Sequence, residues 1–196
     1  MELADHPNII GIKESSGNVE KVTAMVRQTR HIKRTAKVTE VQQAVTGRML
    51  AAPQADALVT LGTSPGAVAV APPKALALKT RTKEVGFQVL VGAAHTLLPS
   101  LQAGASGGVL CIASPAPTIC FEIYSAWRDN DLELARSKQE GLAPVSRRVV
   151  SELGIPAVKY AMDLNGYYGG PPRLPLLPLT AAQKKDIESH MEFFRN

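Results

Sequence analysis

The chain has little cysteine, and this scarcity excludes a disulfide-stabilised fold. Only Cys111 and Cys120 occur among 196 residues, and their spacing does not match a zinc site. Both lie in apolar surroundings, which predicts buried free thiols in a reducing compartment. The four histidines are scattered without paired ligand spacing. The sequence therefore predicts neither a metal site nor a cofactor.

Long apolar runs are also missing. No window approaches the roughly 18 to 20 uninterrupted apolar residues of a membrane helix, so no membrane span is expected. The first residues, Met1–Pro7, are acidic and polar, unlike a signal or transit peptide. Because these residues show no targeting peptide, the cytoplasm is one candidate location for the chain.

Aromatic residues make up 5% of the chain, and segment 31–86 contains none. The same segment holds 8 Lys/Arg against 3 Asp/Glu, which accounts for the whole net charge of +5. A basic surface without stacking rings or a periodic basic helix is not typical of nucleic-acid recognition. We therefore expect no nucleic-acid partner.

Segment 31–86 also differs in its capacity to fold. It contains four prolines but no large ring that would bury apolar area. This composition predicts a disordered or loosely structured insertion between two better ordered regions.

Outside that segment, strand and helix patterns alternate with short links. Residues 9–12 and 87–92 are apolar and β-branched, and 109–113 is a third such run. Helical spacing follows the first of them over 19–30. Alternation of this kind predicts a parallel α/β architecture. Helices are also expected over 96–103 and 119–127, and again from Asp129–Asn130 onward, where Thr180–Gln183 forms a capping box before the last of them.

Lys13 is the residue most suited to chemistry. It ends an apolar strand and precedes a turn, and ligands of parallel α/β folds bind at the carboxyl ends of strands. A lysine rooted in a buried strand is desolvated, which favours a neutral amine that attacks carbonyl groups. From the pattern alone, the simpler interpretation is a strand-end lysine whose ammonium extends into water.

Several motifs in order resemble the dihydrodipicolinate synthase/N-acetylneuraminate lyase family. The first, Ile9 to Gly17, is similar to the Schiff-base motif of that family. The final block, with the Met162-Asp163 pair before it, is most similar to the mitochondrial 4-hydroxy-2-oxoglutarate aldolases of animals. This final block is Gly166–Leu176. The other similar blocks are Gln88–Gly92, Gly104–Val109 and Leu153–Lys159.

This resemblance implies strands six to eight of a (β/α)8 (TIM) barrel in 1–30 and 87–128, with a C-terminal helical region in 129–196. Lys13 would be the Schiff-base nucleophile, Gly92 would let substrate approach the backbone, and Val109 would place its carbonyl near the lysine. The implied reaction is lyase chemistry on a 2-oxo acid, most similar to cleavage of 4-hydroxy-2-oxoglutarate into pyruvate and glyoxylate. A homo-oligomer in the mitochondrion is implied as well.

The sequence also departs from the family pattern. A complete barrel of this type needs roughly 250 residues, and the motifs of the first five strands are missing here. Dihydrodipicolinate synthesis and sialic acid cleavage use the same imine chemistry, so the substrate stays open. The alternative is a catalytically inactive chain that associates with full-length subunits.

Overall fold

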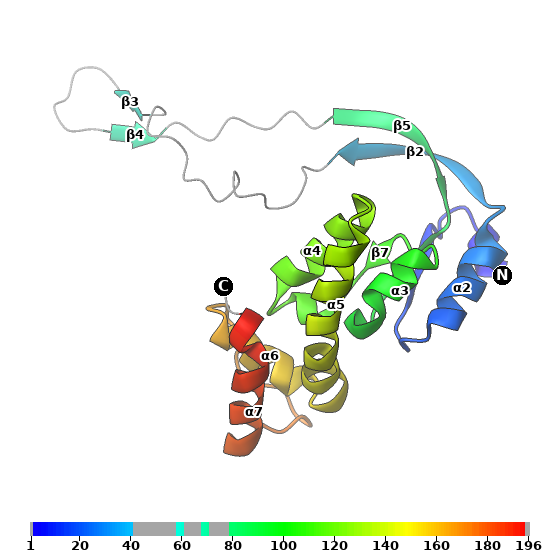
Figure 1. Ribbon diagram of the computed structural model, residues 1–196. Coiled ribbons are helices and arrows are strands. Elements are labelled where there is room, and N and C mark those ends of the chain that lie inside the picture. The colour runs from blue at the N-terminus through cyan, green and yellow to red at the C-terminus, as the bar shows by residue number, and fades with distance from the viewer. Residues whose placement is uncertain (1, 41–57, 61–67, 71–78, 195–196) are drawn as a thin grey trace. The chain divides into compact units, whose positions relative to one another are not determined.

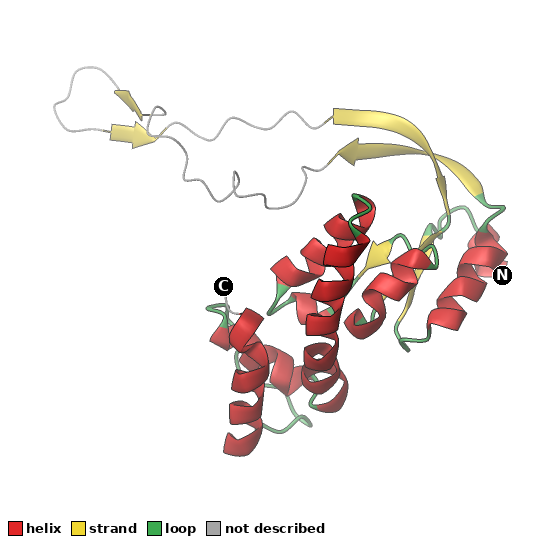
Figure 2. Ribbon diagram, viewed as in Figure 1, coloured by secondary structure: helices red, strands yellow, loops and turns green. Residues whose placement is uncertain are grey.

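The computed structural model describes residues 2–40, 58–60, 68–70 and 79–194. The chain divides into two compact units, one made of Met1–Lys33 with Gly86–Asn196 and the other of Arg34–Val85. Helices and strands of both are drawn in Figures 1 and 2. Every helix among the described residues is too short or too polar to cross a bilayer.

The larger unit contains a three-stranded parallel sheet. Its strands β1 (Gly11–Glu14), β6 (Gln88–Val91) and β7 (Gly107–Gly108) lie in the order β1-β6-β7. This confirms the α/β class and two of the three expected strands. The described strands form an open sheet and do not close a barrel.

The third strand lies earlier in the chain than the predicted range 109–113. Pairing occurs at Gly107–Gly108, and Cys111–Ala113 forms a 3-10 helix, η3. Cys111 is exposed there, which corrects its expected burial, whereas Cys120 is buried as expected. Burial raises the pKa of the Cys120 thiol to about 12.

Helices follow the strands and continue to the end of the chain. Helix α2 begins where predicted, because the Asn18 side chain accepts a hydrogen bond from the Lys21 N–H. The helix expected from Asp129–Asn130 begins instead at Leu132, after its N-cap Asp131. The helical elements of this unit are α1 (Glu2–Asp5), α2 (Val19–Thr29), η2 (Ala94–Thr96), α3 (Leu97–Gln102), α4 (Pro117–Arg128), α5 (Leu132–Ser146), the π-helical η4 (Arg147–Glu152), α6 (Ile155–Leu164), α7 (Ala181–Met191) and η5 (Glu192–Phe194).

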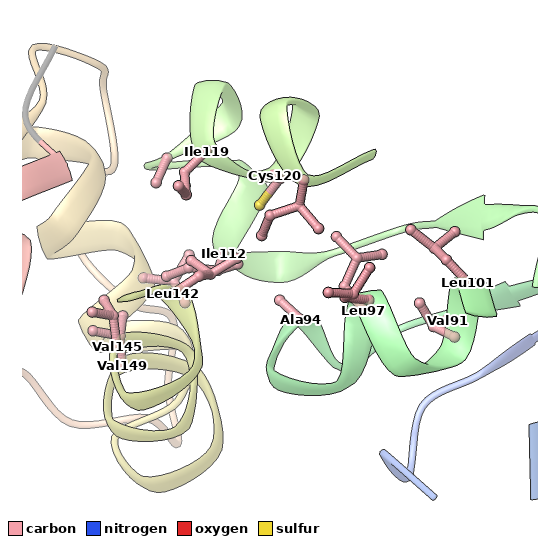
Figure 3. Packing of buried hydrophobic residues seen from close by; sticks show 14 of the residues in the cluster. Val91, Ala94, Leu97, Leu101, Ile112, Ile119, Cys120, Leu142, Val145 and Val149 are labelled. Atoms are coloured by element: carbon pink, nitrogen blue, oxygen red, sulfur yellow. The ribbon is translucent and has the colours of Figure 1, made fainter. Parts of the chain in front are cut away.

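One apolar core joins the sheet to these helices (Figure 3). Val91 of β6 and Leu97 of α3 are 2% exposed, and Ile112 and Leu142 are fully buried. Burying such side chains is the main favourable contribution to folding, at about 1.5–3 kcal/mol each. The C-terminal helices are thus part of the same core as the strands.

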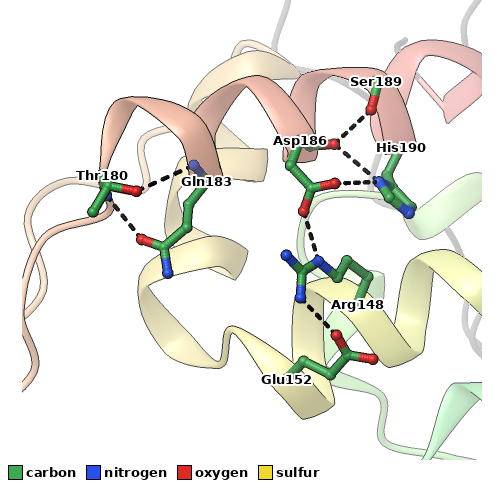
Figure 4. Close-up of polar contacts among 7 residues, drawn as sticks. All are labelled: Arg148, Glu152, Thr180, Gln183, Asp186, Ser189 and His190. Carbon is green, nitrogen blue, oxygen red and sulfur yellow. Dashed lines mark hydrogen bonds and ion pairs between the residues drawn. The ribbon is translucent and has the colours of Figure 1, made fainter.

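A polar network ties the last helix to η4 (Figure 4). Arg148 Nε donates to Asp186 at 2.6 Å, and its Nη1 pairs with Glu152 at 2.7 Å. Asp186 also lies 3.4 Å from His190 Nδ1. The predicted capping box of α7 is present, with reciprocal hydrogen bonds between Thr180 and Gln183.

The second unit contains short strands. Strands β2 (Lys33–Glu40) and β5 (Lys79–Gly86) form one two-stranded sheet, and β3 (Leu58–Thr60) pairs antiparallel with β4 (Val68–Val70). These strands occur where the composition predicts a loose insertion. The rest of segment 31–86 lies outside the described residues, and its disorder stays a prediction.

Candidate active site

The carboxyl ends of the three parallel strands form one edge of the sheet. Lys13 pairs in register with Leu90, and Leu90 with Gly107. The ladder continues past the strands, because the Gly92 N–H donates to the Glu14 carbonyl at 2.6 Å and the Val109 N–H to the Val91 carbonyl at 2.8 Å. The three predicted site residues Lys13, Gly92 and Val109 therefore follow one another across this edge.

Lys13 itself is exposed, and so is its strand neighbour Ile12, at 41%. The sequence pattern predicts a buried strand around this lysine. The reason for the difference is that β1 is an edge strand of the described sheet, whereas Val89 and Val91 in the central strand are buried. Val109 is likewise exposed, at 53%.

Gly92 lies close to the Lys13 side chain. A β-carbon at position 92 would lie 2.6 Å from Cε of Lys13 and 2.5 Å from Oγ of Ser15. Any larger residue would displace one or both of these side chains. The missing side chain at 92 therefore lets the lysine stem extend across the end of β6.

Glu14, next to the lysine, organises the turn that follows β1. Its buried carboxylate accepts hydrogen bonds from the Ser16 N–H at 2.9 Å, the Gly17 N–H at 3.2 Å and the Ser16 hydroxyl, and it pairs with Lys21 at 3.2 Å. Burial raises the pKa of this carboxyl, but the hydrogen bonds from Ser16 and the charge of Lys21 outweigh it and hold the pKa below its usual value. Sequence reasoning missed this role.

A small pocket of about 110 Å³ lies beside Gly92 and is lined by Ser15, Ser16, His95 and Cys111 among others. His95 is half-buried and packs against Gly17, where a β-carbon would lie 2.9 Å from its Nε2. Burial and then the charge of Arg147 hold the pKa of His95 below its usual value. Both effects favour the neutral imidazole over its protonated form.

The described parts of the chain contain no group of three or more His, Cys, Asp or Glu side chains placed to hold a metal ion. The chemical groups at the edge of the sheet are instead an amine, hydroxyls, a thiol and an imidazole. Such a set suits nucleophilic and proton-transfer chemistry on a small polar substrate.

The fold and this edge define a parallel α/β protein that carries a lysine beside the carboxyl end of its central strand. Residues 45–193 match the dihydrodipicolinate synthetase family, and the chain belongs to that family. The matched range begins within segment 31–86 and does not include Lys13.

Curated relatives of the chain carry the name of a synthase of this family. A 4-hydroxy-tetrahydrodipicolinate synthase from Acidiphilium cryptum is 37% identical over 105 residues, which cover 54% of this chain and 36% of that protein. The synthase from Methanoculleus marisnigri is 26% identical over 95% of this chain and 46% of its own length.

Among solved structures, dihydrodipicolinate synthase from Bacillus anthracis superposes with a TM-score of 0.65 at 20% identity, over 100% of this chain and 48% of that one. A dihydrodipicolinate synthase from Acinetobacter baumannii, solved with pyruvate, has a TM-score of 0.64 at 19% identity, over 97% of this chain and 47% of that one. These likenesses show the fold. The chain spans less than half the length of each of these relatives.

Proposed function

We propose that the chain carries the Schiff-base half of a 2-oxo-acid lyase, with Lys13 as the nucleophile. The observation that carries this proposal is the close approach of Gly92 to Lys13 and Ser15 at the carboxyl edge of the sheet. Family membership and the pyruvate bound to the Acinetobacter baumannii enzyme support it.

The chemistry proceeds through an imine. The neutral amine of Lys13 adds to the ketone carbon of the 2-oxo acid, and loss of water leaves a protonated imine. As the carbon–carbon bond breaks, the hydroxyl on the far carbon loses its proton and that fragment leaves as an aldehyde, while the electron pair of the bond passes to the imine and forms an enamine. Protonation of the enamine carbon and hydrolysis then return the free lysine and the shortened 2-oxo acid. The mechanism requires no metal and no cofactor.

The proposed substrate is 4-hydroxy-2-oxoglutarate, cleaved to pyruvate and glyoxylate. It rests on the resemblance of Gly166–Leu176 to aldolases with that activity. A second candidate is the condensation that forms 4-hydroxy-tetrahydrodipicolinate, which is favoured by the names of the matched relatives. Both begin with an imine between Lys13 and a 2-oxo acid, and separate assays of the cleavage and of the condensation distinguish them.

In this proposal β1, β6 and β7 correspond to strands six to eight of a (β/α)8 barrel. The edge of β1 is unpaired in the described sheet, and Ile10 beside it is 70% exposed. Unpaired edges and exposed apolar side chains are suited to pairing with further strands. The alternative function, association with full-length subunits without catalysis, rests on these same features.

Borohydride trapping tests the proposal directly. The chain is incubated with pyruvate, reduced with borohydride and mapped by mass spectrometry. A pyruvyl adduct on Lys13 that disappears in Lys13→Ala, with Lys159 unlabelled as an internal control, is the expected result. No adduct, or labelling spread over many lysines, would exclude Schiff-base chemistry for this chain.

A further inference from the structure

We propose that Gln139, on helix α5, is a positioning residue for the lysine site. This inference rests on the proposed function. Gln139 is 8% exposed, and its side chain reaches the segment that follows β6. Its Oε1 accepts a hydrogen bond from the Leu98 N–H at 2.8 Å, and its Nε2 donates to the Ala94 carbonyl at 3.0 Å. Both partners lie more than 40 residues away in sequence.

The start of α3 needs the Gln139 acceptor because it does not cap itself. Thr96 is the N-cap residue of α3, yet it makes no side-chain capping bond. Its hydroxyl donates instead to the Ala93 carbonyl at 3.1 Å. The first N–H groups of a helix have no partner within the helix, and a buried unpaired N–H costs about 1–3 kcal/mol. Gln139 thus supplies from another helix the acceptor that the local sequence lacks.

The connection to Lys13 runs through Gly92. This glycine begins the segment, and its N–H is fixed to the Glu14 carbonyl. Two residues later Ala94 is held by Gln139 and is 2% exposed. The segment 92–98 is therefore fixed at one end by β1 and at the other by α5. A β-carbon at position 92 would lie 2.6 Å from Lys13 Cε, so the Gly92 backbone lies beside the lysine stem, and we expect a shift of the segment to change the position of that stem.

The test compares variants by the rate of pyruvate-adduct formation on Lys13 at saturating pyruvate. Gln139→Leu keeps the volume but removes both hydrogen bonds, and it is expected to slow adduct formation about ten-fold or more, since small misplacements of reacting groups cost such factors. Gln139→Glu keeps the acceptor for Leu98 but replaces the donor to the Ala94 carbonyl with a carboxylate oxygen, so it is expected to slow adduct formation as well.

Asn165→Leu is the matched control. Asn165 is a second partly buried amide that joins distant segments, donating to the carbonyls of Pro115 at 2.6 Å and Phe194 at 2.8 Å. Its loss is expected to lower stability to a similar degree, as measured by thermal unfolding, while leaving the adduct rate within about two-fold because its hydrogen bonds go to Pro115 and Phe194 and not to segment 92–98.

The possible outcomes separate the two proposals. If the unaltered chain labels Lys13 and Gln139→Leu labels it at the same rate, the role of Gln139 is wrong and the proposed function stands. The role of Gln139 is also wrong if Asn165→Leu slows labelling as much as Gln139→Leu. If the unaltered chain forms no adduct at Lys13, the proposed function fails, and the inference fails with it.

Discussion

Gly92 leaves space that two side chains of the neighbouring strand end occupy. Replacing it with alanine would bring a β-carbon to 2.5 Å from Ser15 Oγ and 2.6 Å from Lys13 Cε. We expect Gly92→Ala to lower stability by about 1–3 kcal/mol through overpacking and to slow pyruvate-adduct formation about ten-fold or more. Chemical denaturation and borohydride trapping measure the two effects.

Gly107→Ala is the control for this change. Gly107 also lies in the sheet, on the strand beyond β6, but a β-carbon there would meet only Leu90 Cδ2 at 3.7 Å, an ordinary contact. It is expected to retain stability and labelling. Equal behaviour of the two alanine variants would contradict the argument from close approach.

Glu14 makes the turn after β1 sensitive to acid. Its pKa in the folded chain lies below the ordinary value of 4.5, so the folded state favours the ionised carboxylate. The resulting stability is complete above pH 4.5 and is lost as the pH falls through the depressed pKa of the folded state. We expect the free energy of unfolding, measured in urea, to decrease over that acidic range.

The variant Glu14→Gln separates this carboxylate from the other acidic groups. It is expected to be less stable at pH 7 by about 1–3 kcal/mol, because one buried network loses its charged acceptor. It should also show a smaller loss of stability on acidification. An unchanged acid dependence would show that other carboxylates govern it.

Helix α7 is attached by its first turn and by its contact with η4 (Figure 4). Thr180 accepts a hydrogen bond from the Gln183 N–H, and Gln183 reaches back to the Thr180 N–H at 2.8 Å. Thr180→Ala is expected to cost about 1 kcal/mol in a urea titration. Thr118→Ala, an exposed position within α4, serves as the control and should be close to neutral. A neutral Thr180→Ala would mean that Arg148 and Asp186 alone hold the helix start in place.

Local signals predict the elements that depend on local chemistry. Asn18 and Thr180 each cap a helix through a side-chain bond within three residues, and both helices begin where the sequence indicates. Strand β7 differs, because two glycines have no strand preference of their own. They pair since Leu90 and Val91 lie beside them, which is a tertiary effect. The apolar run 109–113 has the pattern of a strand, yet part of it forms a 3-10 helix.

The site residues that lie in local motifs can be predicted from the sequence, whereas those that act through distant partners cannot. Lys13, Gly92 and Val109 follow from motif order, and the structure places all three at one edge of the sheet. The two hydrogen bonds of Gln139 could not be predicted, because its partners Ala94 and Leu98 are 45 and 41 residues away in the sequence. In the sequence it is one polar residue in an amphipathic helix, indistinguishable from those that face water.

The chain as a whole combines two units of different composition. Composition alone indicates a boundary near residues 31 and 86, and the second compact unit comprises Arg34–Val85. The ends of this segment meet, since a β-carbon on Gly86 would lie 3.5 Å from the Ile32 carbonyl oxygen. Adjacent ends are the geometry expected of a segment inserted into a fold that is continuous on either side. The family match begins at residue 45 and therefore includes part of segment 31–86. The contribution of this segment to folding can be measured by removing it.

Excision of residues 34–85, with Lys33 joined to Gly86 through a short glycine-serine linker, measures this contribution. All described helices and the whole parallel sheet lie in the retained residues, so we expect the helical circular dichroism per molecule to persist and unfolding to stay cooperative. Leu142→Ala, in the buried core, is then introduced into both versions. Because Leu142 is fully buried within the retained unit, its cost of about 2–5 kcal/mol should be the same with and without the segment. A non-cooperative excised chain, or a Leu142 effect that changes on excision, would instead make residues 34–85 an integral part of the fold that carries Lys13.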